Sequence, residues 1–197
     1  MSGTAILPPR EDGYVRKSWS VSECHSLVKN GLLTPGKYEL IEGEILFKMG
    51  QGRLHIAAIT RIIAALTALF GSEAIQSQAQ IGIGEQDEYN DPEPDVAVLR
   101  GSVRDYLESE PDPAADVLLV VEAAHTTLQG DLTTKARLYA RHGVPEYWVV
   151  AIANRELIVH RQPTPEGYTQ VQTFHIDDSI SPLAAETASV HIADLLP

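Results

Sequence analysis

Two apolar runs on either side of one helical segment constrain the fold of this chain more than any other feature. Val117–Val121 is continuously apolar, and the second run covers Tyr147–Ile152. Between them, Leu132–His142 has apolar residues at helical spacing, and a glycine and a proline then close the helix. Continuous apolar runs are typical of strands buried on both faces. A helix between two such strands predicts a parallel pair joined by a right-handed crossover.

The segments before this unit predict a helix and two further strands. Arg53–Phe70 has apolar residues at helical spacing, and Gly71 ends it. Ile75–Ile83 and Asp95–Leu99 have the composition of strands and are joined by short links. The order is therefore helix, strand, strand, strand, helix, strand, with the first three strands antiparallel. This order predicts an α/β fold with a mixed central sheet flanked by helices.

Both ends of the chain predict smaller elements. The S-V-S-E run from Ser20 has the spacing of a capping box, which predicts a short helix up to Gly31. Tyr38–Met49 predicts a hairpin that turns at Glu42 and Gly43. Three further expectations concern the last third of the chain: a hairpin of Tyr147–Ile152 with Leu157–His160, edge strands from Tyr168 onward, and an N-cap at Asp131.

Composition limits the classes of protein to which the chain can belong. We expect one domain over residues 18–197 after a flexible N-terminal arm, residues 1–17. The formal charge, 15 − 27 = −12, argues against a nucleic-acid binder that relies on overall positive charge. It does not exclude a nuclease, because a metal ion and a local basic patch can hold phosphate. A single cysteine, no apparent secretion signal and no sufficiently apolar span predict a cytoplasmic protein without a membrane segment.

Three side chains predict a catalytic site. Asp95 follows Pro94 at the start of one strand, and Glu122 ends the next. Lys135 lies three residues after Leu132 and so borders the buried face of the helix. Two acids and a lysine are what a metal-dependent phosphodiester hydrolase needs, since the acids hold a divalent cation and the lysine meets charge on the phosphate. The alternatives are a turn residue at the aspartate, a structural salt bridge at the glutamate and a solvated lysine.

Two further groups could complete this site. Glu39, Glu42 and Glu44 lie close together in one strand-turn segment, and one of them could join the metal ligands. His55, at the start of the long helix, could contact the scissile phosphate or a water molecule. The alternative for His55 is a helix-start side chain satisfied by the backbone.

Several motifs together resemble one known family. They are P-D-V-A-V-L at residues 94–99, L-L-V-V-E at 118–122, D-L-T-T-K-A-R-L-Y-A-R-H-G-V-P-E-Y-W-V-V at 131–150, and Y-E-L-I-E-G-E at 38–44. The chain resembles, from Ser18 to its C-terminus, the Uma-type family of restriction-endonuclease-like proteins in the PD-(D/E)XK nuclease superfamily. The resemblance implies a restriction-endonuclease-like core with the order α-β-β-β-α-β.

The resemblance also implies roles for individual residues. Asp95 matches the first metal-binding aspartate of the family, Glu122 the second acid, and Glu39 an early glutamate. The superfamily usually has a lysine two residues after the second acid, where this chain has Ala124; Lys135 matches a lysine that has moved to the following helix. The run A-A-H-T-T at 123–127 departs from the small hydroxyl or acidic residues that are usual in the family.

These observations predict hydrolysis of DNA phosphodiester bonds with Mg²⁺ or Mn²⁺. An enzyme that cuts both strands usually needs two copies, so a homodimer is plausible. The departure at residues 123–127 leaves open a catalytically inactive nuclease-fold module that binds a protein partner. Hydrolysis of another phosphate ester is a third alternative. The chain has no glycine-rich phosphate loop followed by Lys-Ser/Thr, which argues against a nucleotide kinase or an ATPase.

Overall fold

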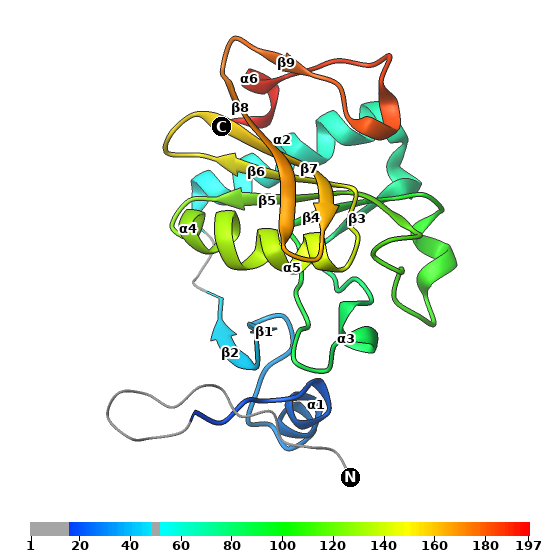
Figure 1. Cartoon of the computed structure of the whole chain (residues 1–197), viewed down its shortest axis with the longest axis vertical. Helices are drawn as coiled ribbons and strands as arrows, with labels where there is room; N and C mark the ends of the chain where they lie inside the picture. The colour runs from blue at the N-terminus through cyan, green and yellow to red at the C-terminus, as the bar shows by residue number, and fades with distance from the viewer. Residues whose placement is uncertain (1–15, 49–51) are drawn as a thin grey trace. The chain divides into compact units, whose positions relative to one another are not determined.

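The computed structural model describes residues 16–48 and 52–197, which form two compact units (Figure 1). The first unit comprises the chain up to residue 50 together with residues 80–93, and the second comprises residues 51–79 and 94–197. The predicted flexible arm lies outside the described residues, except for its last two positions. The prediction of one domain over residues 18–197 stays a prediction.

The first unit contains a capped helix and a hairpin, as the sequence predicts. Helix α1 (Val21–Lys29) begins after Ser20, whose side chain accepts a hydrogen bond from the Glu23 backbone, while Glu23 binds the Ser20 N–H in return. Strands β1 (Tyr38–Ile41) and β2 (Glu44–Phe47) are antiparallel. Glu42 and Gly43 both have positive φ, at 51° and 77°, as a tight hairpin turn requires.

Residues 80–93 pack against this hairpin within the first unit. They contain the short helix α3 (Ile83–Gln86). Asp91 forms an antiparallel bridge with Leu40, and the Asn90 side chain accepts a hydrogen bond from the Glu42 N–H. A small core forms around buried Cys24, Leu33, Tyr38 and Leu40.

The second unit is built on one six-stranded mixed sheet with the strand order β3-β4-β5-β6-β7-β8. Only β5 and β6 are parallel; the other neighbours are antiparallel. The strands are β3 (Ile75–Ser77), β4 (Val96–Leu99), β5 (Val117–Ala124), β6 (Glu146–Ala151), β7 (Glu156–Thr164) and β8 (Gly167–His175). The predicted antiparallel strands, parallel crossover, hairpin and edge strand are therefore confirmed.

Helices cover both faces of this sheet (Figure 1). On one face, α2 (Arg53–Phe70) and α6 (Ile192–Leu195) pack on alternate residues of β4 and β5, such as Val96 and Val121. The other face carries a helical segment made of α4 (Leu128–Gly130), a π-helical turn (Asp131–Lys135) and α5 (Ala136–Arg141). The remaining elements are the strand pair β9 (Ser179–Ile180) and β10 (Val190–His191) and short 3-10 turns at Ser72–Ala74, Val103–Tyr106 and Leu183–Ala185.

Helix α2 is long and apolar enough, by length and composition alone, to cross a membrane. The structure gives it a different environment, because Ala58, Ile59, Ile62 and Leu66 are buried in the core of the second unit. The helix therefore packs as a core helix, and its bounds match the prediction.

One predicted strand is wrong over most of its length. The segment predicted as a strand over Ile75–Ile83 is extended only to Ser77, and Gln78 then takes a left-handed conformation with φ 52°. Ile81 and Ile83 are fully buried within the first unit, and Ile83 begins α3. The alternating apolar residues of this segment therefore do not form one face of a strand. Ile81 and Ile83 are buried in the first unit instead.

Candidate active site

Asp95 and Glu122 lie at the same end of two neighbouring strands. In the antiparallel pair β4–β5, Val96 lies opposite Val121. Asp95 directly precedes Val96, and Glu122 directly follows Val121. The sheet therefore carries both predicted acids at one end of this strand pair, and their joint role in a cation site stays a prediction.

The carboxylate of Asp95 is held by the neighbouring strand and by helix α2. Its Oδ2 accepts a hydrogen bond of 2.8 Å from the Ala123 N–H. Its Oδ1 lies 3.4 Å from Nε2 of His55 in the first turn of α2. These contacts fix the orientation of the Asp95 side chain.

Both ring nitrogens of His55 have partners. Nδ1 lies 2.8 Å from the Ala123 carbonyl oxygen, so Nδ1 must carry a proton and donate. Nε2 can then donate to Asp95 only when the imidazole is protonated. The hydrogen bond with Asp95 raises the pKa of His55 above its usual value, and burial opposes this shift. The alternative prediction for His55, a hydrogen bond between its side chain and the backbone, is therefore confirmed. A contact of His55 with phosphate or water stays a prediction.

Glu122 receives two hydrogen bonds on a single oxygen. Its Oε1 accepts from Lys135 Nζ at 2.9 Å and from the Tyr139 hydroxyl at 2.9 Å. The Glu122 and Lys135 side chains are 6% and 14% exposed, so this ion pair is largely shielded from water. The predicted approach of the lysine to the second acid is therefore present in the structure.

The helix that carries Lys135 departs from ideal geometry at this point. Residues Asp131–Lys135 form a π-helical turn, and such turns are rare and frequent at functional sites. Asp131 is buried inside the helix, where its carboxylate accepts from the Thr127 hydroxyl and its carbonyl oxygen accepts from the Tyr147 hydroxyl. The predicted N-cap at Asp131 is therefore wrong, because the helix begins earlier, at Leu128.

Tyr139 is a residue of this site that the sequence analysis did not identify. Its hydroxyl contacts the same Glu122 oxygen as Lys135 does. A signal was available, since residues four apart lie on one helix face, and both can then point at the strand that carries Glu122.

The three glutamates of the first unit have local partners. Glu39 Oε1 accepts from the Glu93 N–H at 3.1 Å and lies 4.0 Å from Lys48 Nζ. Glu42 is the turn residue of the hairpin, and Glu44 pairs with Arg16. The role of Glu39 as a further metal ligand stays a prediction.

The carboxylates of Asp95 and Glu122 are the kind of ligand that a hard cation prefers. Within residues 16–48 and 52–197, no group of three or more His, Cys, Asp or Glu side chains is arranged to hold a metal ion. Mg²⁺ does not need such a group, because it usually keeps several waters and is bound by one or two carboxylates with the substrate phosphate. The oxygen donors of Asp95 and Glu122 fit this coordination.

Comparison with known proteins identifies the family and the fold. Residues 26–193 match the sequence model of the Uma2 family, described as "Putative restriction endonuclease". The fold is similar to the crystal structure of a "putative nuclease" of the DUF820 group from Anabaena variabilis, with a TM-score of 0.66, 18% sequence identity, and coverage of 89% of this chain and 96% of that one. At this identity, the likeness shows the fold alone. No curated protein matches this chain significantly.

Proposed function

Because the chain belongs to the Uma2 family of restriction-endonuclease-like proteins, we propose that it is a metal-dependent endonuclease that hydrolyses DNA phosphodiester bonds. The observation that carries the proposal is the cluster of Asp95, Glu122 and Lys135. Asp95 directly precedes β4 and Glu122 lies on β5, at the same end of this strand pair, and the lysine contacts Glu122 at 2.9 Å. This combination of charges matches the chemistry that phosphodiester hydrolysis requires.

Asp95 and Glu122 would hold the cation, Mg²⁺ or Mn²⁺. A divalent cation in this position supplies polarisation of the phosphate oxygen and lowers the pKa of a bound water. The Ala123 N–H and His55 keep the Asp95 carboxylate in one orientation, so little rearrangement is needed on binding.

Lys135 would act on the phosphate rather than on the cation. Its ammonium group is shielded from water and anchored by Glu122, which makes its electrostatic effect stronger than that of a surface lysine. From this position it can orient the attacking water or stabilise negative charge that develops on the phosphate. Tyr139 holds the Glu122 oxygen that Lys135 also contacts.

A nuclease assay tests the proposal. The full chain is incubated with Mn²⁺ and with plasmid, linear and single-stranded DNA, beside the variants Asp95→Ala and Glu122→Ala. We expect cleavage of at least one substrate by the wild type, its loss in both variants, and no cleavage in excess chelator. A matched control, Asp194→Ala, removes an exposed carboxylate of the second unit and should cleave as the wild type does. Cleavage that persists in Asp95→Ala would overturn the proposal.

A further inference from the structure

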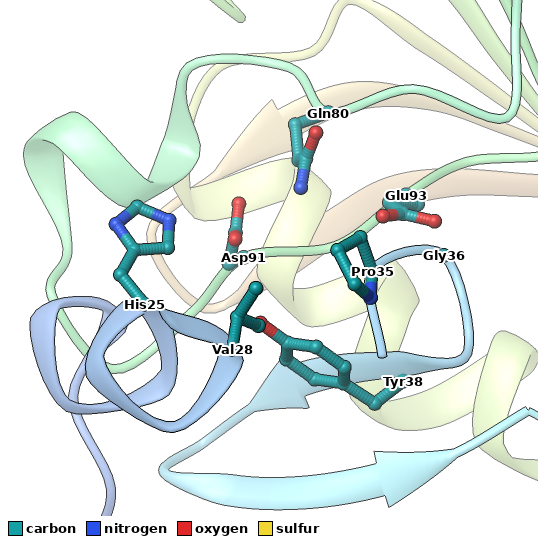
Figure 2. A pocket seen from close by; sticks show the side chains of 8 residues that line it. All are labelled: His25, Val28, Pro35, Gly36, Tyr38, Gln80, Asp91 and Glu93. Carbon is teal, nitrogen blue, oxygen red and sulfur yellow. The ribbon is translucent and has the colours of Figure 1, made fainter. Parts of the chain in front are cut away.

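A pocket of about 210 Å³ lies within the first unit (Figure 2). Side chains from α1, from the loop before β1, from β1 and from residues 80–93 surround it. Its volume corresponds to roughly seven water molecules at about 30 Å³ each, which is below the range of pockets for drug-sized ligands. The pocket can therefore accept one small ring or the tip of a larger molecule.

The walls of the pocket combine flat apolar surfaces with hydrogen-bonding groups. Val28, Pro35 and Tyr38 supply the apolar surfaces. Four polar side chains complete the lining: His25, Gln80, Asp91 and Glu93. Such a mixture is typical of sites that take an organic ligand and orient it by a few polar contacts.

The pocket is not a metal site built of three or more protein ligands. Among the described residues, no three His, Cys, Asp or Glu side chains are arranged to hold a metal ion. His25, Asp91 and Glu93 therefore line one space without forming such a group.

The two carboxyl groups of the pocket already have partners. Glu93 forms an ion pair with Lys48. Asp91 is 8% exposed, and its burial raises the pKa of its carboxyl group, while the charge of His25 and a hydrogen bond from Gln80 oppose this shift. Because Glu93 is paired with a cation and Asp91 already accepts from Gln80, the lining is better suited to a neutral polar ligand than to an organic cation.

A nucleobase combines the properties that this lining requires. Its flat faces can pack on the Tyr38 ring and on Pro35, since bases stack on aromatic side chains regardless of their sequence. A carboxylate such as that of Asp91 accepts a hydrogen bond from an exocyclic amino group, and the Gln80 amide beside it can both donate and accept.

We propose that this pocket binds one unpaired nucleobase that carries an exocyclic amino group: adenine, cytosine or guanine. The proposal rests on the proposed function, because a nuclease substrate brings bases to the protein. A base bound in this pocket must be unpaired, because a paired base does not expose its edge or its faces.

Binding of free nucleosides to the full chain tests the pocket without any phosphodiester bond. Adenosine, cytidine, guanosine and thymidine are each titrated in the absence of divalent metal and followed by NMR chemical shifts. We expect at least one amino-bearing nucleoside to bind with a dissociation constant on the order of millimolar. Thymidine should bind about tenfold more weakly, because its base lacks the amino group.

Substitutions of pocket residues test whether nucleosides bind in this pocket. Asp91→Asn keeps the side-chain shape and should weaken binding about tenfold, whereas Glu88→Gln, which removes the same charge from an exposed position of the same unit, should not. Tyr38→Leu should also weaken binding about tenfold, because the stacking surface is lost. Each variant is first checked for cooperative thermal unfolding. If Asp91→Asn is unfolded, the test uses Gln80→Ala, which should also weaken binding, together with the comparison of thymidine with the amino-bearing nucleosides.

The outcomes separate this proposal from the proposed function. Absence of nucleoside binding, equal binding of thymidine, or full binding in folded Asp91→Asn would overturn the base pocket even if the chain cleaves DNA. Asp95→Ala should bind nucleosides as the wild type does. A chain that binds them but cleaves no DNA would overturn the nuclease and leave the pocket supported.

Discussion

Two buried glutamates on the parallel strands β5 and β6 have very different surroundings. Glu146 is fully buried, and its Oε1 accepts from the Trp148 indole and from two nitrogens of Arg161. Its Oε2 accepts from the Leu183 N–H at 2.7 Å. Glu122 is 4% exposed and pairs instead with the single ammonium of Lys135, beside Tyr139. Both carboxylates satisfy the rule that a buried charge needs partners.

The kind of partner is consistent with a structural role for Glu146 and with the role that we propose for Glu122. Arginine presents a rigid planar fork, and Arg161 also donates to the Ser181 carbonyl, so the Glu146 cluster ties three segments of the second unit together. Lysine is a compact charge on a flexible stem that can turn toward a phosphate. A carboxylate held by an arginine fork, an indole and the backbone therefore serves stability, whereas one held by a lysine is suited to chemistry.

The largest expected effect is on stability, at the Glu146 cluster. Arg161→Ala should lower the free energy of unfolding by about 3–5 kcal/mol, because it leaves a fully buried carboxylate without its cation. Urea denaturation measures the change. Arg104→Ala is the matched control, since it removes a surface pair with Glu73 and should cost at most about 1 kcal/mol. Equal losses of unfolding free energy in the two variants would contradict a structural role for the Glu146 cluster.

The next effect is on cleavage, at the Glu122 cluster. Lys135→Ala should lower the single-turnover cleavage rate about 100-fold to 1000-fold, because charge on the phosphate is no longer stabilised. Its loss of stability should be smaller than that of Arg161→Ala, since Tyr139 still donates to Glu122. Lys29→Ala, at an exposed position in the first unit, is the control. If Lys135→Ala cleaves as fast as the wild type, the assigned role is wrong.

Two tyrosine variants, Tyr139→Phe and Tyr168→Phe, separate an effect on cleavage from an effect on stability. Tyr139→Phe should lower the unfolding free energy by about 1 kcal/mol and slow cleavage roughly tenfold, because Glu122 loses one of the two donors to Oε1. Tyr168→Phe removes a hydroxyl that donates to the Val144 carbonyl instead. It should cost similar stability and leave the cleavage rate unchanged, so parallel losses of cleavage would contradict a specific role for Tyr139.

The smallest effect is a pH dependence at a third buried group. His160 is 4% exposed, its ring packs against those of Tyr147 and Tyr168, and its Nδ1 has no hydrogen-bond partner among the described residues. Burial lowers the pKa of His160 below the usual value of about 6.5. As the pH falls through 6.5 toward the lower folded-state pKa, the unfolded chain binds the proton more readily, so stability decreases.

The variant His160→Phe keeps a ring at this position and should flatten the acid limb of the unfolding free energy between pH 7 and 5. His175→Phe, at a side chain that is 68% exposed, is the control and should retain the slope. An unchanged slope in His160→Phe would assign the acid sensitivity to other groups.

The sequence predicts the frame of the second unit well because strong local signals agree with burial. Helix α2 has the predicted bounds since its apolar spacing faces the sheet and a glycine ends it. The prediction that β5 and β6 are parallel is confirmed. Both strands are continuously apolar, so both of their faces must be buried, as in a parallel pair covered by helices. The same reasoning anticipated that Lys135 would reach Glu122.

The errors occur where tertiary contacts override the local pattern. The π-helical turn and the burial of Asp131 depend on Thr127 and Tyr147, and the latter lies 16 residues away in sequence. The extended backbone ends at Ser77 because Gln78 takes a left-handed conformation. No glycine stands at this position to indicate such a conformation in the sequence. The partners of Glu146 lie as far as 37 residues away, which no local pattern can reveal.

Calorimetric titration of the full chain with Mn²⁺ shows whether Asp95 and Glu122 form one cation site. We predict saturable binding of Mn²⁺ to the wild type that is lost in Asp95→Asn and retained in Asp194→Asn. Binding that is unchanged in Asp95→Asn, or no binding to the wild type, would mean that the two acids do not form this site.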